Sequence, residues 1–90
     1  MADSNSLTLT VLGSAGAYRI HDGSRASGYL VQHGATTLVL DLGHGTYAPL
    51  AAQIGISALP QISAVAISHL HLDHWVDLAA LRHALVHGNK

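Results

Sequence analysis

Cysteine is absent from this chain of 90 residues. Its absence excludes disulfide bonds and thiolate metal sites, so a transition-metal site would have to be built from His and Asp. Basic residues are scarce too, because Lys and Arg together number only 4. So few bases form no stripe along which a phosphate backbone could lie, and we expect no bulk binding of nucleic acid.

Long apolar runs are also lacking. No run approaches the roughly eighteen apolar residues that a membrane span needs, and residues 1–6 show no basic region followed by an apolar stretch. We therefore expect no membrane association and a cytoplasmic location. What the chain does have is 49% hydrophobic and only 10% charged residues, which predicts one small domain with a buried core.

Strand patterns dominate the first half of the chain. Apolar or alternating runs predict strands over residues 7–12, 28–32, 36–40 and 63–68. The spacer His33-Gly34-Ala35 predicts that the second and third strands form an antiparallel hairpin. The fourth run is continuously apolar, which is typical of a strand buried on both faces.

Two helices are expected around the fourth strand. Thr46 is positioned to cap the first, whose apolar face would comprise Tyr47, Leu50, Ala51 and Ile54. Asp77 is positioned to cap the second, whose apolar stripe would comprise Leu78, Leu81 and Leu85. The order of elements indicates an α/β layer arrangement, with helices packed on a sheet.

The densest chemistry in the sequence is the segment Ser68-His69-Leu70-His71-Leu72-Asp73-His74, which ends the fourth predicted strand. His69 and His71 are two residues apart, so both imidazoles can project to one side and share a metal ion. Asp73 and His74 can reach a second ion at the spacing of two-metal hydrolytic sites, roughly 3.5–4 Å. Such ligands suit zinc, manganese or ferrous iron, which generate hydroxide near neutral pH.

A chance cluster of solvated histidines is the alternative interpretation, because the chain contains 8 His. By composition alone, this pattern should arise in only about a few per thousand such chains. The segment also follows a predicted buried strand, where ligand loops are commonly found. Both arguments favour a metal site.

The spacing of His69, His71, Asp73 and His74 resembles the HxHxDH signature of the metallo-β-lactamase superfamily of metallohydrolases. Residues 11–16, 26–31 and 38–43 are similar to the opening segments of its ribonuclease Z-like and cyclic-nucleotide phosphodiesterase-like branch. The resemblance implies two divalent ions, zinc or else manganese or iron. His69 and His71 would bind the first ion, and Asp73 and His74 the second. Asp41, in an Asp-x-Gly turn, would orient a metal ligand or the metal water by hydrogen bonding.

The resemblance also carries an expectation about completeness. The family fold is an αβ/βα sandwich of two similar halves, so residues 1–90 would form a single partial domain: its N-terminal half, a mixed sheet covered by helices on one face. A later His and a bridging Asp of the family have no matching positions here. We therefore expect an open sheet face that pairs with the missing C-terminal half or with another copy in a homo-oligomer, and we expect the 90 residues alone to be catalytically inert.

Three residues outside the cluster are candidates for contact with the substrate: Ser14, Arg25 and His44. Ser14 lies in a glycine-flanked turn that could cradle a phosphate, although a plain strand-ending turn is the simpler interpretation. Arg25 could meet a phosphate or be an ordinary surface arginine. His44 could approach the metals or be an ordinary loop histidine.

A second histidine pair, His83 and His87, lies four residues apart on the last predicted helix, a spacing that can clamp a metal ion. The pair falls opposite the leucine stripe, so we expect it to be solvated.

Together these observations predict a metal-dependent hydrolase. It would cleave a phosphodiester or other ester bond of a small-molecule or nucleotide substrate by metal-activated hydroxide, with Asp73 taking part in proton transfer as well as binding metal. The alternative is a non-catalytic metal-binding or interaction module, because four ligands can hold an ion without completing an active site.

Overall fold

The computed structural model describes residues 6–14, 25–68 and 74–87. Its elements are β1 (Leu7–Gly13), β2 (Gly28–His33), β3 (Thr36–Leu42), α1 (Tyr47–Ile54), the 3-10 helix η2 (Ile56–Gln61), β4 (Ala64–Ala66) and α2 (Leu78–His87). The order predicted from the sequence is confirmed, with η2 as an addition. None of these helices, nor any other in the described ranges, is long and apolar enough to cross a membrane.

The strands form one sheet in the order β1-β2-β3-β4. β2 pairs antiparallel with both β1 and β3, and β4 pairs parallel with β3. The predicted hairpin between β2 and β3 is confirmed, and Gly34 at its turn adopts a φ of 57° that glycine tolerates without strain. β1, β3 and β4 therefore run in the same direction, and their carboxyl ends meet at one edge of the sheet.

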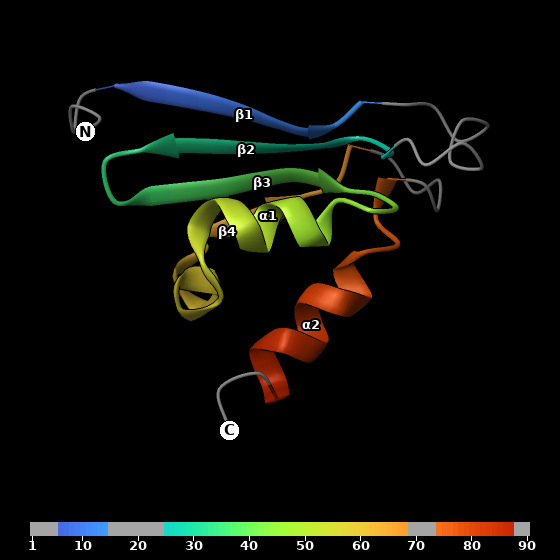
Figure 1. Cartoon of the computed structure of the whole chain (residues 1–90). Coiled ribbons are helices and arrows are strands. Elements are labelled where there is room, and N and C mark those ends of the chain that lie inside the picture. The colour runs from blue at the N-terminus through green and yellow to red at the C-terminus, as the bar shows by residue number, and fades with distance from the viewer. Residues whose placement is uncertain (1–5, 15–24, 69–73, 88–90) are drawn as a thin grey trace.

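The core lies between one face of the sheet and the helices. Its buried residues are Leu12, Leu30, Val39, Leu42, Leu50, Leu59 and Leu81. In Figure 1, α1 runs beside β3 and β4, while β1 forms the edge of the sheet that is farthest from the helices. Close packing also explains a glycine: a Cβ added at Gly28 would lie 2.7 Å from Cγ2 of Thr46. This contact brings the start of β2 against the loop that follows β3.

The opposite face of the sheet is apolar, and none of the described helices covers it (Figure 1). Because side chains alternate along a strand, this open sheet face comprises Leu7, Leu9, Val11, Tyr29, Val31, Leu38 and Leu40, which lie next to one another in the strand register. The side chains on β1 remain largely accessible: Leu7 is 73% exposed, Leu9 61% and Val11 57%. The face is one contiguous apolar surface rather than scattered single residues.

Two packing predictions are wrong. β4 is not buried on both faces, because it spans only three residues at a sheet edge and both Ala64 and Ala66 are exposed. Leu85 of the predicted leucine stripe is 42% exposed. α2 meets the core through Leu78, Leu81 and Ala84 instead, which places Leu85 beyond the contact.

Candidate metal-binding site

Asp41 is the next-to-last residue of β3 and lies at the edge of the sheet where the carboxyl ends of β1, β3 and β4 meet. Its backbone has a φ of 59°, a left-handed conformation that Asp adopts more readily than most residues. The residue is only 6% exposed. A buried carboxylate requires hydrogen-bond donors, and the chain supplies them from the segment after β4.

Both ends of the predicted ligand segment donate to Asp41. The backbone N–H of Ser68 donates to Oδ1 at 2.6 Å, and the Ser68 hydroxyl donates to Oδ2 at 2.7 Å. Nδ1 of His74 lies 2.9 Å from the same Oδ2. Ser68 directly precedes the HxHxDH motif and His74 is its final residue, so one carboxylate contacts the two residues that flank residues 69–73.

The charge of Asp41 determines which ring nitrogen of His74 carries the proton in this contact. Burial raises the pKa of this carboxyl, but hydrogen bonds from the Ser68 backbone, the His74 ring and the Ser68 hydroxyl outweigh burial and hold it below its usual value of 3.8. An ionised carboxylate only accepts hydrogen bonds, so Nδ1 of His74 must be the donor. A neutral His74 then carries its lone pair on Nε2, which is the form of a metal-binding imidazole whose other nitrogen is fixed by a carboxylate.

The other predicted ligands, His69, His71 and Asp73, lie outside the described residues. Within the ranges that are described, no three His or Asp side chains are grouped closely enough to hold a metal ion. The ligand set and the orienting role of Asp41 therefore stay predictions, and the contact between Asp41 and His74 is the geometry that such a role requires.

The candidate substrate residues lie at the same edge of the sheet as Asp41. Ser14 follows β1, and the backbone carbonyl of His44 accepts from Ala26 N–H at 3.0 Å, which ties the segment before β2 to the loop after β3. Arg25 lies against the end of β1 and the loop after β3, since a Cβ added at Gly13 would be 2.6 Å from its Cβ and one at Gly45 would be 3.3 Å from its Cγ. All three side chains are exposed, and their contact with a substrate stays a prediction.

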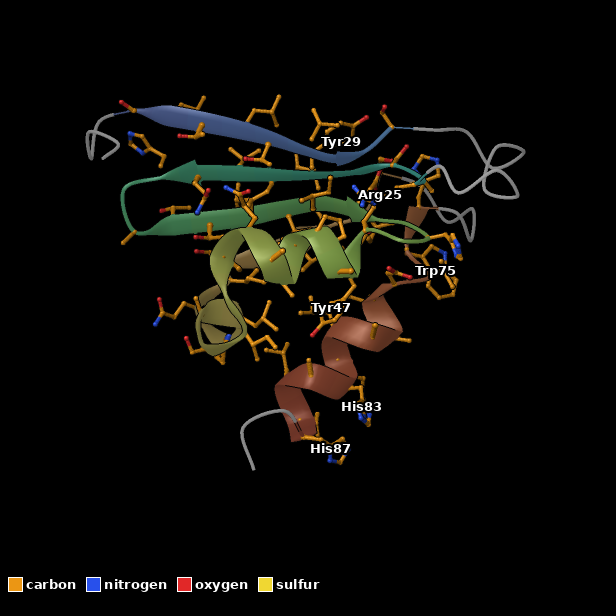
Figure 2. The ribbon with its side chains drawn as sticks, in the orientation of Figure 1. Arg25, Tyr29, Tyr47, Trp75, His83 and His87 are labelled. Atoms are coloured by element: carbon orange, nitrogen blue, oxygen red, sulfur yellow. The ribbon has the colours of Figure 1, made fainter. Side chains whose placement is uncertain are left out.

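The second histidine pair lies elsewhere. The rings of His83 and His87 are 4.7 Å apart between centroids, and both residues are exposed on α2 as expected. Figure 2 places them toward the far end of α2, whereas Arg25 and Trp75 lie near the strand ends that carry Asp41. His83 and His87 are therefore separate from the side chains around Asp41.

The capping predictions need correction. Thr46 is the N-cap residue of α1 but makes no capping hydrogen bond with its side chain, because its φ of −90° and ψ of −17° are helical rather than extended. Its hydroxyl donates instead to the carbonyl of Gly43 at 2.6 Å. The carboxylate of Asp77 does not cap α2. It accepts from the N–H of Tyr47, in the first turn of α1, at 2.9 Å.

Ser68 and Asp77 are thus the residues near this site whose roles sequence reasoning missed. Each carried a partial signal: Ser68 is a hydroxyl at the end of an apolar run, and Asp77 is a typical capping residue before a helix. Neither signal names the partner, because Asp41 and Tyr47 are 27 and 30 residues away in the chain.

Comparisons with known proteins bear on the family and the fold of this chain. A family model described as anti-Pycsar protein Apyc1 matches residues 7–88. The crystal structure of the metallo-beta-lactamase fold protein YhfI from Bacillus subtilis is 30% identical in sequence and aligns with 89% of this chain at a TM-score of 0.76. The chain spans 32% of YhfI. No curated protein sequence matches it. The predicted fold class is confirmed: a mixed sheet with helices on one face, forming part of a metallo-β-lactamase fold.

Proposed function

This chain belongs to the family of the anti-Pycsar protein Apyc1, and on that premise we propose that it forms the metal-binding part of a hydrolase that cleaves a cyclic nucleotide at its phosphodiester bond. The observation that carries the proposal is the pair of contacts by which Asp41 holds Ser68 and His74 at the two ends of the HxHxDH segment. The name of the family and the metallo-β-lactamase fold of YhfI support a cyclic-nucleotide substrate and a divalent-metal site.

His69, His71, Asp73 and His74 are the proposed ligands of two divalent ions, which we propose are zinc. When bound, such ions supply hydroxide near neutral pH for attack on an ester. Asp41 keeps the proton of His74 on Nδ1, so that Nε2 is presented for binding. Asp73 is proposed to take part in proton transfer as well as in binding.

The proposed substrate side is the edge formed by Ser14, Arg25 and His44. The Arg25 guanidinium is a cation at this edge and would pair with the phosphate of the substrate. Within the superfamily, we propose that the chain belongs to the ribonuclease Z-like and cyclic-nucleotide phosphodiesterase-like branch, because residues 11–16, 26–31 and 38–43 resemble its opening segments. We also propose a cytoplasmic location for the protein.

Zinc content is the direct test of the ligand assignment. We expect the purified chain to bind zinc and the His71→Ala variant to lose binding at the first site, because an imidazole ligand has been removed. Emission spectrometry measures the bound metal. His87→Ala is the matched control, since it removes an exposed histidine away from the site and should leave the zinc content unchanged. Unchanged zinc in His71→Ala would show that the ligand assignment is wrong.

Hydrolysis is measured in the whole protein or assembly that contains this chain, with a cyclic nucleotide and a chromogenic phosphodiester, each with and without added zinc or manganese. We expect metal-dependent cleavage that His71→Ala removes and His87→Ala retains. Tight zinc binding without cleavage of either compound would instead favour a non-catalytic metal-binding module.

Acidification should release the metal. Ligand imidazoles must be neutral, and the usual pKa of histidine is about 6.5, so zinc affinity should fall steadily below that pH. Equilibrium dialysis across a pH series measures the occupancy. Full occupancy well below pH 5 would contradict a site built on imidazoles.

The open sheet face suggests how the chain is completed. We propose that this face packs against a second apolar sheet layer, which the remainder of a metallo-β-lactamase fold or a second copy of the chain would supply. The support is its largely exposed Leu7, Leu9 and Val11 and the 32% of YhfI that the chain spans. On this proposal residues 1–90 alone are catalytically inert.

A further inference from the structure

Asp77 connects three elements that converge behind the candidate site. Its backbone N–H donates to the carbonyl of Leu42 at the end of β3, at 3.0 Å. Its carboxylate accepts from Tyr47 N–H at the start of α1, at 2.9 Å. Its own carbonyl accepts from Leu81 N–H in the first full turn of α2, at 3.1 Å. A single residue thus makes hydrogen bonds to a strand end and to the starts of both helices.

The carboxylate fills a need that α1 cannot meet locally. The first N–H groups of a helix have no partner inside it, and α1 has no acidic residue in its first turn. The side chain of Thr46 makes no hydrogen bond to these N–H groups, and its hydroxyl donates to the Gly43 carbonyl instead. Asp77 supplies an acceptor and a negative charge at the positive end of α1 from 30 residues away. Tyr47 lies between α1 and α2 in Figure 2, where it packs on the core.

Asp77 ends the short turn of residues 74–77, which begins with His74. Residues 74–77 are tied to β3 at both ends, because His74 contacts Asp41 and the N–H of Asp77 donates to the neighbouring residue, Leu42. A shift of Asp77 would therefore move the turn relative to Asp41 and change the hydrogen bond that orients His74. The connection from Asp77 to His74 spans only four residues, all of which the structure describes.

We propose that Asp77 is a positioning residue: by fixing the 74–77 turn against β3 and α1, it sets the orientation of the His74 imidazole toward Asp41. The inference rests on the proposed function only in that His74 is taken as a metal ligand. The competing explanation is that Asp77 merely caps α1 and adds stability without affecting His74.

NMR of the purified, metal-free chain separates the two explanations. In Asp77→Ala we expect amide exchange at Tyr47 to become about tenfold faster, since a cap is lost. We also expect the ring nitrogen shifts of His74 and the amide shift of Ser68 to change, because both groups donate to Asp41. Asp77→Asn retains an oxygen acceptor for Tyr47 and should restore most of these signals.

Ala52→Gly is the matched control. Ala52 is exposed on α1, so this variant weakens the helix by its intrinsic propensity without touching Asp77. It should leave His74 and Ser68 unchanged. The inference is overturned if Asp77→Ala affects Tyr47 alone, or if Ala52→Gly shifts His74 as much as Asp77→Ala does.

A zinc titration of the same proteins adds a separate readout. We expect zinc affinity in Asp77→Ala to fall about tenfold, the lower range seen when a residue that orients a metal ligand is removed. Affinity equal to wild type would overturn the inference. Failure of the wild-type chain to bind zinc would instead overturn the proposed function, and the metal-free NMR comparison would still decide the role of Asp77.

Discussion

Replacement of Asp41 with Ala is expected to lower the free energy of unfolding by about 3 kcal/mol, because it removes the acceptor of three partly buried hydrogen bonds and places Ala at a φ of 59°. The Ser68 N–H and the His74 Nδ1–H would be left without this acceptor. Urea denaturation followed by circular dichroism measures the loss. A change below about 0.5 kcal/mol, the range of an ordinary surface substitution, would contradict a stabilising role for the hydrogen bonds from Ser68 and His74 to Asp41.

Asp41→Asn separates stability from metal binding. Asn tolerates the left-handed backbone and can still accept from the Ser68 N–H, so we expect a loss of only about 1–2 kcal/mol. Its amide NH₂ no longer requires the proton of His74 to be on Nδ1. Zinc affinity should therefore fall by about 10- to 100-fold, out of proportion to the loss of stability. Chelator competition measures this affinity, and wild-type affinity in Asp41→Asn would exclude an orienting role.

The effect of pH follows from the sign of the pKa shift. The pKa of Asp41 is lower in the folded chain than its usual value of 3.8, so the ionised form stabilises the fold at neutral pH. This contribution is present above about pH 4 and is lost as the pH falls through the lowered pKa. The difference in stability between wild type and Asp41→Asn should therefore shrink below about pH 4.

The second large effect is expected on the open sheet face. We expect the isolated chain to self-associate through this face, because a second copy offers the same apolar surface. Leu9→Lys should weaken association by more than about 100-fold, since it removes roughly 1.5–3 kcal/mol of apolar burial and places a charge in the contact. In a symmetric pair the change occurs twice. Sedimentation velocity across a concentration series measures the association.

Thr8→Lys provides the matched control for this experiment. Thr8 is also exposed on β1, but it is adjacent in sequence and therefore points to the other face of the sheet. It should leave the association unchanged. A wild-type chain that sediments as a well-folded monomer and hydrolyses phosphodiesters rapidly would contradict both the open-face pairing and the expected inactivity of residues 1–90.

Several features were accessible from the sequence because they depend on local pattern. The hairpin could be predicted since two β-prone runs flank a short Gly-containing spacer, and α1 could be predicted from the apolar positions at helical spacing around Leu50. The metal-site hypothesis also came from local spacing, in His69, His71, Asp73 and His74. The exposure of Ala64 and Ala66 in β4 could not be predicted, because an apolar run does not indicate which of its faces packs against a neighbour.

The sequence by itself determined the order of the strands and of the two main helices, and it gave rise to the metal-site hypothesis for the HxHxDH segment and, by resemblance, for Asp41. Only the tertiary structure decided that the Asp41 carboxylate joins Ser68 to His74 and that Asp77 caps α1 rather than α2. The physical reason is that a side chain such as Asp can satisfy any nearby donor. Which donor is near depends on how β3, the 74–77 turn and α1 pack together, and that packing involves residues about 30 positions apart in the chain.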